Sequence, residues 1–195
     1  MQAPREAHLE AAMRIVRYLK GSPGQGILLS ANKDLTLEVY CDSDFQSCPL
    51  TRRSLSAYVV LLGGSPISWK TKKQDTVSHS SAEAEYRAMS VALKEIKWLN
   101  KLLKELGITL AAPTRLFCDS KAAISIAANP VFHERTKHIE RDCHSVRDAV
   151  RDGIITTHHV RTSEQLADIF TKALGRNQFI YLMSKLGIQN LHTPT

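Results

Sequence analysis

Apolar and polar residues alternate over residues 35–42, in the order Leu-Thr-Leu-Glu-Val-Tyr-Cys-Asp. A period of two is typical of a β-strand that buries one face. The last residue of this predicted strand, Asp42, is a carboxylate, and Ser43 and Asp44 follow it. Because open α/β sheets place their sites at the carboxyl ends of central strands, Asp42 is the first candidate functional residue.

Period-two and helical spacings of apolar residues divide the rest of the chain into strands and helices. Period-two patterns predict strands at 27–30, 56–62, 66–71, 114–119 and 154–160. Helical spacing of apolar residues predicts helices at 6–19, 81–106, 120–128, 134–151, 166–174 and 179–186. We expect strands 27–30 and 35–42 to form a hairpin. The long helix is expected to begin at a capping box of Ser80 and Glu83 and to kink or split near Leu93.

The order of these elements predicts the fold class. Three consecutive strands with short links form an antiparallel meander, and β/α units follow them. This order indicates an α/β fold with one mixed sheet and helices on its faces. Trp69 and Trp98 are expected to lie in the core.

Composition narrows the classes of function. A chain of 195 residues with 43% hydrophobic residues suits one domain with a real core. The net charge of +7 favours polyanionic partners such as nucleic acid. No apolar run approaches the ~20 residues that span a membrane, so we expect no membrane partner. Four cysteines without a CxxC pair suit reduced thiols in an intracellular protein.

Four carboxylates lie at comparable positions in the predicted elements. Asp42 and Asp119 each end a strand, whereas Glu85 and Asp168 each lie in the second turn of a helix. Taken singly, each acid fits a solvated or helix-capping role. Taken together, they can face one rim of the sheet, where they would repel one another unless cations lie between them. Because oxygen ligands suit Mg²⁺ or Mn²⁺, we hypothesise a site for two divalent ions.

Seven short stretches of the sequence resemble the motifs of one known protein family. They are Tyr40–Phe45, Thr51–Tyr58, Ile67–Gln74, Ser80–Tyr86, Cys118–Ile124, Arg135–Ile139 and Gln165–Lys172. In this order, from about residue 35 to 174, they resemble the ribonuclease H domain of copia-type LTR retrotransposon Pol polyproteins. Residues 6–26 resemble the segment that joins the reverse transcriptase of that family to its ribonuclease H. The chain is thus similar to a C-terminal fragment of a Pol polyprotein, or to a gene derived from one.

The resemblance implies a fold, an activity and a cofactor. The fold would be ribonuclease H-like, a five-stranded mixed sheet of three antiparallel and two parallel strands flanked by helices. The activity would be hydrolysis of the RNA strand of RNA–DNA hybrids during reverse transcription, with two Mg²⁺ ions and Mn²⁺ as the alternative. The catalytic, metal-binding acids of the family correspond here to Asp42, Glu85, Asp119 and Asp168.

For two of these four positions, a second acidic residue lies close by in the sequence and is an alternative. Glu85 fits the Ala-Glu step of the family better than Glu83, which we assign to the helix cap. Asp42 fits the first acid better than Asp44, although Asp44 remains a candidate to line the site.

The sequence departs from the family pattern in two places. Phe45-Gln46 stands where copia-type domains usually have Trp-Ala, a change from which we expect little harm. The loop Val160–Ser163 lacks the mobile His that many cellular ribonucleases H carry before the last acidic helix. We expect the missing His to slow product release or water activation and to leave metal binding unaffected.

The resemblance also implies an organisation and partners. We expect residues 1–30 to be a connection segment, 31–175 the ribonuclease H-like domain, and 176–195 a C-terminal helix with a polar tail. The expected partners are an RNA–DNA hybrid and the reverse transcriptase domain of the same polyprotein, with the chain itself a monomer. The expected location is the cytoplasm, within a virus-like particle, or the nucleus.

Basic and hydroxyl side chains near the acids are candidates for nucleic-acid contact. The candidates for phosphate contact are Arg52, Arg53, Lys70, Lys72 and Lys73. A solvated sheet edge explains these charges equally well. Ser43 and Ser120 are candidates to contact ribose 2′-hydroxyls, although Ser120 fits a helix cap better.

A second class of function competes with the enzyme. The chain could be a non-catalytic nucleic-acid-binding or protein-interaction module that keeps the fold of a retroelement fragment. The presence of all four acids favours the enzyme, whereas the missing loop His favours the module. A related integrase or nuclease is disfavoured by the stretches Ser80–Tyr86 and Gln165–Lys172.

Overall fold

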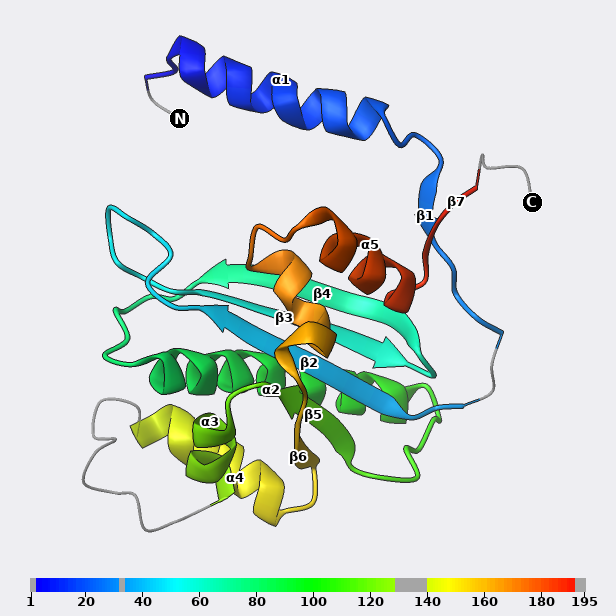
Figure 1. Cartoon of the computed structure of the whole chain (residues 1–195). Coiled ribbons are helices and arrows are strands. Elements are labelled where there is room, and N and C mark those ends of the chain that lie inside the picture. The colour runs from blue at the N-terminus through cyan, green and yellow to red at the C-terminus, as the bar shows by residue number, and fades with distance from the viewer. Residues whose placement is uncertain (1–2, 32–33, 129–139, 192–195) are drawn as a thin grey trace.

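A five-stranded mixed sheet forms the centre of the chain in a computed structural model that describes residues 3–31, 34–128 and 140–191 (Figure 1). Its strands are β2 (Leu37–Asp44), β3 (Leu55–Leu62), β4 (Ser65–Lys73), β5 (Thr114–Cys118) and β6 (Ile155–His159). They lie in the order β4-β3-β2-β5-β6. The meander β2-β3-β4 is antiparallel, whereas β5 runs parallel to both β2 and β6. The predicted α/β class, with three antiparallel and two parallel strands, is confirmed.

Helices cover both faces of this sheet (Figure 1). One face is covered by α2 (Ser81–Glu105), with α3 (Lys121–Ala128) and α4 (Glu140–Arg151) beside it. The other face is covered by the short 3₁₀ helix η3 (Leu166–Phe170), which contacts β2 and β3, and by α5 (Arg176–Lys185). Two apolar clusters result, because the sheet buries side chains on both of its faces.

The alternation along β2 explains how the sheet is oriented. Leu37, Val39 and Cys41 are buried in the cluster under α2. The residues between them face the other side, where Tyr40 packs against the second cluster. Asp42 follows Tyr40 by two residues and therefore lies on the same side, towards η3.

The long helix α2 begins where the sequence predicts and runs without interruption to Glu105. The Ser80 hydroxyl accepts a hydrogen bond from the Glu83 backbone N–H at 3.1 Å. The Glu83 carboxylate accepts instead from the His79 N–H and pairs with Arg87, so the expected reciprocal bond to Ser80 is replaced. The predicted split near Leu93 is wrong, since α2 is one continuous helix of 25 residues.

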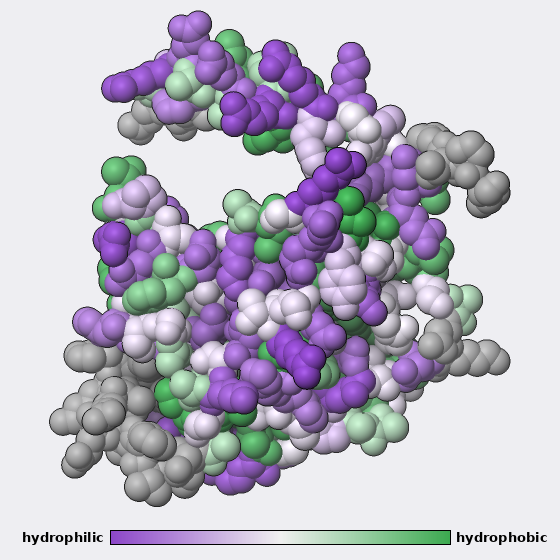
Figure 2. Space-filling model, in the orientation of Figure 1, coloured by the Kyte–Doolittle hydropathy of each residue, from purple (hydrophilic) through white to green (hydrophobic). Residues whose placement is uncertain are grey.

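A segment that follows α1 (Glu6–Lys20) meets the C-terminal part of the described chain in a separate small sheet. Strand β1 (Gln25–Ile27) pairs antiparallel with β7 (Ile188–Asn190). The predicted hairpin of 27–30 with 35–42 is therefore wrong, and the predicted polar tail contains a strand. None of the fifteen residues of α1 is buried. Figure 2 shows open space between this helix and the rest of the molecule.

Both tryptophans lie nearer the surface than their apolar character predicts. Trp69 on β4 is 50% exposed and Trp98 on α2 is 56% exposed. Trp69 shares its sheet face with the buried Val59 but lies on the edge strand, where half of it stays exposed. The predicted core position is therefore wrong for both. Among the described residues, no helix combines the length and the apolarity that crossing a membrane requires.

We expect the two sides of α2 to differ strongly in their contribution to stability. Ile96 is fully buried, so Ile96→Ala should lower the free energy of unfolding by about 2–5 kcal/mol through lost burial and a residual cavity. The exposed Trp98 is the control, and Trp98→Ala should cost less than about 1 kcal/mol. Urea unfolding of both variants measures the difference. A larger loss for Trp98→Ala would contradict this packing.

Candidate metal centre

Asp42 lies near the carboxyl end of the central strand β2 and is fully buried. One of its carboxylate oxygens accepts a short hydrogen bond from the Thr171 hydroxyl. The other accepts from the ammonium group of Lys172 at 3.1 Å. Both donors come from the segment that follows η3, on the face of the sheet away from α2. Asp42 is thus held from the side opposite to the long helix.

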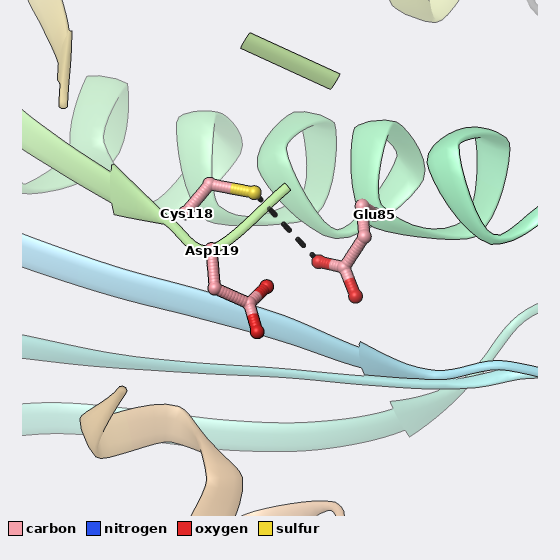
Figure 3. Close-up of side chains that lie close together, drawn as sticks. All are labelled: Glu85, Cys118 and Asp119. Atoms are coloured by element: carbon pink, nitrogen blue, oxygen red, sulfur yellow. Dashed lines mark hydrogen bonds between the residues drawn. The ribbon is translucent and has the colours of Figure 1, made fainter. Parts of the chain in front are cut away.

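Glu85 approaches the same region from α2 and is 8% exposed. The Ser43 backbone N–H donates to its Oε1 at 3.2 Å. The Cys118 thiol donates to its Oε2 at 3.7 Å. Figure 3 shows the carboxylates of Glu85 and Asp119 turned towards the same space beside Cys118. The start of α2 therefore brings this acid against the ends of β2 and β5.

Asp119 follows β5 directly and is the most open of the four acids. Its Oδ2 accepts from the Thr162 hydroxyl at 3.1 Å, and its backbone carbonyl lies 3.2 Å from a ring nitrogen of His159. Because β5 runs parallel to β2, their carboxyl ends meet at one edge of the sheet. The predicted position of Asp119 at a strand end is confirmed.

Asp168 lies in η3 and is 3% exposed. The predicted α-helix over 166–174 is wrong here. The chain instead forms two short 3₁₀ helices, η2 (Thr162–Glu164) and η3. The Gln165 side chain accepts from the Ala167 N–H and donates to the Cys41 carbonyl, which fixes η3 against β2. This link places Asp168 beside Asp42.

The four acids form two groups that share Asp119. One group is Asp42, Asp119 and Asp168, and the other is Glu85, Cys118 and Asp119. Within each group, one ligand atom from every residue lies within 4.8 Å of the others. The first group offers only carboxylate oxygens, the donors that Mg²⁺ and Mn²⁺ prefer. The second adds a thiol, which is a softer ligand than these ions favour.

Crowding and burial change the acidity of two of these groups. Burial, followed by the nearby charges of Asp42, Cys118 and Asp119, raises the pKa of Glu85 to about 10. Burial also raises the pKa of Asp168 to about 6, against the opposing effect of its hydrogen bond with Lys172. Carboxyl groups that are hard to ionise together fit a site where divalent cations balance their charge.

Lys172 is the site residue that reasoning from the sequence missed. Its Nζ lies 2.7 Å from Asp168 Oδ1, in addition to its contact with Asp42. Burial lowers the pKa of Lys172, but the hydrogen bond with Asp168 and the charge of Asp42 outweigh this effect and raise it above its ordinary value. The signal was available, because Lys172 follows Asp168 by four residues within a stretch that resembles the family.

The basic candidates for phosphate contact lie on the edge strand β4 and on the loop before β3. Lys70, Lys72 and Lys73 are all exposed on β4. Lys72 pairs with Asp75, and the ammonium group of Lys73 lies 3.2 Å from the Cys48 sulfur.

Arg52 and Arg53 are exposed in the loop, where a guanidinium nitrogen of Arg52 donates to Gln46. Their contact with nucleic acid stays a prediction.

The two serine candidates differ in their surroundings. Ser43 is buried, and its hydroxyl accepts from the Gln74 side-chain amide at 3.3 Å. Ser120 is half-buried, and its hydroxyl accepts from the Ala123 N–H at 3.2 Å, at the start of α3. The favoured role of Ser120 as a helix cap is confirmed. A contact of either serine with a ribose stays a prediction.

Comparison with known proteins shows which proteins this chain resembles. The chain is 45% identical, over 188 residues, to the retrovirus-related Pol polyprotein from transposon RE1 of Arabidopsis thaliana. The match covers 96% of the chain and 13% of that polyprotein. The chain thus matches a short segment of copia-type Pol polyproteins in sequence and has a ribonuclease H-like fold. No family model matches it.

Solved ribonucleases H share the fold at low sequence identity. The N-terminal ribonuclease H domain of a Mycobacterium tuberculosis protein superimposes with a TM-score of 0.51 at 13% identity, covering 77% of this chain and 98% of that domain. The ribonuclease H1 LC11, from compost, was solved in complex with an RNA/DNA hybrid. It superimposes with a TM-score of 0.51 at 10% identity, covering 68% of this chain and 91% of its own.

The raised pKa of Glu85 predicts how stability depends on pH without metal. The unfolded chain ionises Glu85 above its ordinary pKa of 4.5, whereas the folded protein keeps it neutral up to about pH 10. The unfolded state therefore binds fewer protons in this window, and stability falls as pH rises through it. Glu85→Gln should remove this loss, which is at most about 1.4 kcal/mol per pH unit.

Urea unfolding at pH 5 and pH 8 in EDTA measures this effect. Glu105→Gln, the same substitution at an exposed position of α2, is the control and should keep the wild-type pH dependence. If Glu85→Gln also keeps that dependence, the account of Glu85 is wrong.

Proposed function

We propose that this segment is a metal-dependent endonuclease that hydrolyses the RNA strand of RNA–DNA hybrids during retroelement reverse transcription. The observation that carries the proposal is the pair of acid groups that share Asp119 at one edge of a ribonuclease H-like sheet. Homology to transposon Pol polyproteins supports the same conclusion. In this proposal the catalytic residues are Asp42, Glu85, Asp119 and Asp168.

The four acids would divide the binding of two Mg²⁺ or Mn²⁺ ions between them. Asp42 and Asp119 would bridge or bind both ions, Glu85 would hold the one nearer the attacking water, and Asp168 would complete the second position. When bound, such ions supply an activated water and stabilise the leaving oxygen of a phosphodiester. The hydrogen bonds from Ser43 to Glu85 and from Thr162 to Asp119 orient these carboxylates before substrate arrives.

The exposed lysines of β4 provide the proposed electrostatic contact with the hybrid. Phosphates supply much of the affinity for nucleic acids, and closely spaced ammonium groups on an edge strand can pair with a charged backbone. Arg52 and Arg53 extend the same charge along the loop before β3. We propose ribose contacts for Ser43 and Ser120, whose hydroxyls accept hydrogen bonds within the protein and keep their O–H groups as donors.

From the same homology we propose how the chain is divided and where it acts. Residues 31–175 would form the nuclease domain, with 1–30 as the connection to a reverse transcriptase domain and 176–195 as a C-terminal extension. The pairing of β1 with β7 supports treating the two flanking segments together. The segment would act as a monomer inside cells, in a cytoplasmic virus-like particle or in the nucleus.

One observation favours a second candidate function, that of a non-catalytic binding module. The loop from Val160 to Ser163 has no His, and the ring of the preceding His159 contacts the Asp119 carbonyl. Slow product release or weak water activation would follow if this loop normally supplies a proton carrier. A module of this kind would bind the hybrid without cutting it.

Cleavage of a labelled RNA–DNA hybrid with Mg²⁺ or Mn²⁺ separates the two functions. We expect the RNA strand to be cut and Asp42→Asn to lower the rate by at least about a hundredfold, because it removes one charge from the shared ligand set. Asp152→Asn, the same substitution at an exposed acid that follows α4 and lies outside both acid groups, is the control and should cut normally. If folded protein binds the hybrid with either metal but does not cut it, the endonuclease is excluded and only the binding-module function remains.

The basic edge predicts a salt-dependent loss of affinity. Lys70→Ala should weaken hybrid binding and reduce the slope of log affinity against log salt by about one, because one phosphate contact is lost. Lys101→Ala, on the exposed surface of α2, is the control and should leave the slope unchanged. Fluorescence anisotropy at several salt concentrations measures both. Equal slopes for both variants would show that β4 is only a solvated edge.

A further inference from the structure

The ammonium group of Lys172 lies between two acids of the candidate metal centre. It contacts Asp42 Oδ1 at 3.1 Å and Asp168 Oδ1 at 2.7 Å. Both carboxylates are buried, with 0% and 4% of their side chains exposed, whereas 32% of the Lys172 side chain is exposed. A positive charge that reaches inwards from the surface therefore balances part of the negative charge of the site.

A divalent ion would require the same oxygens. Oxygens of Asp42, Asp119 and Asp168 already lie within 4.8 Å of one another, and Mg²⁺ binds its ligands at about 2.0–2.1 Å. An ion bound to Asp42 and Asp168 together would have to lie between them, which is where Lys172 Nζ lies. The two cations therefore exclude each other from this position.

We infer that Lys172 is a built-in counter-ion that holds Asp42 and Asp168 together in the metal-free protein and must be displaced when a metal binds there. The inference rests on the proposed metal site. Lys172 acts on the site through Asp42 and Asp168, so it is a positioning residue rather than a catalytic one.

The structure provides a way for this displacement to occur. The lysine stem is flexible, and 32% of the Lys172 side chain is exposed, so the side chain can turn towards solvent. Thr171 remains as a donor to Asp42 after the ammonium group leaves. The same positive charge that stabilises the metal-free fold then competes with the incoming ion, so the two effects have opposite signs.

Lys172→Gln tests this competition, because glutamine keeps N–H donors at this position but carries no charge. We expect Mn²⁺ to bind the variant about tenfold more tightly or better by calorimetry, since a like charge beside the ion is removed. The melting temperature in EDTA should fall. Lys172→Arg keeps the charge and should bind Mn²⁺ no more tightly than the wild type. Lys101→Gln, an exposed lysine on α2, should change neither quantity.

The outcomes distinguish this inference from the proposed function. If Mn²⁺ binds the wild type and Asp42→Asn weakens that binding, the metal site is present. Unchanged or weaker binding by Lys172→Gln would then overturn the counter-ion role alone. Absence of Mn²⁺ binding at the acids of the wild type would overturn both. If Lys172→Gln unfolds in EDTA, its refolding on titration with Mn²⁺ supports the role, and failure to refold contradicts it.

Discussion

Mutual repulsion among four carboxylates is the constraint that the surrounding structure must satisfy. Asp42 and Asp119 come from neighbouring parallel strands, whose carboxyl ends meet at one edge of the sheet. Glu85 and Asp168 approach that edge from opposite faces, from α2 and from η3. Burying such charges is costly unless protons, hydrogen bonds or cations compensate them. Each compensation is present here: a raised pKa at Glu85, hydroxyl and amide donors, and the ammonium group of Lys172.

Two buried glutamines join the elements that carry these acids. The Gln74 amide donates to the hydroxyls of Ser43 and Ser56 and to the Ala84 carbonyl, so it ties β2, β3 and the start of α2 together. Gln165 ties η3 to the Cys41 carbonyl on β2. The residues that these glutamines contact on β2 and α2 are direct neighbours of Asp42 and Glu85 in the sequence. The two links therefore fix the separation of the carboxylates before any ion binds.

Local patterns predicted the positions of the acids better than they predicted their partners. The alternation that ends at Asp42 and the cap at Ser80 are short-range features, and both are present in the structure. The pairing of β1 with β7 joins segments more than 160 residues apart, and no local pattern encodes it. Lys172 was missed because a lysine four residues after an acid usually marks an exposed helical ion pair. That spacing cannot show that Asp42 lies on the other side of the ammonium group.

The central claim is that the four acids hold two divalent ions around Asp119. Anomalous diffraction from crystals of the protein grown with Mn²⁺ and an RNA–DNA hybrid tests it most directly. The account predicts two manganese peaks near Asp42 and Asp119, one also contacting Glu85 and the other also contacting Asp168, with Lys172 moved away from Asp42. Saturating Mn²⁺ that gives no peak at these acids, with Lys172 still between Asp42 and Asp168, would contradict it.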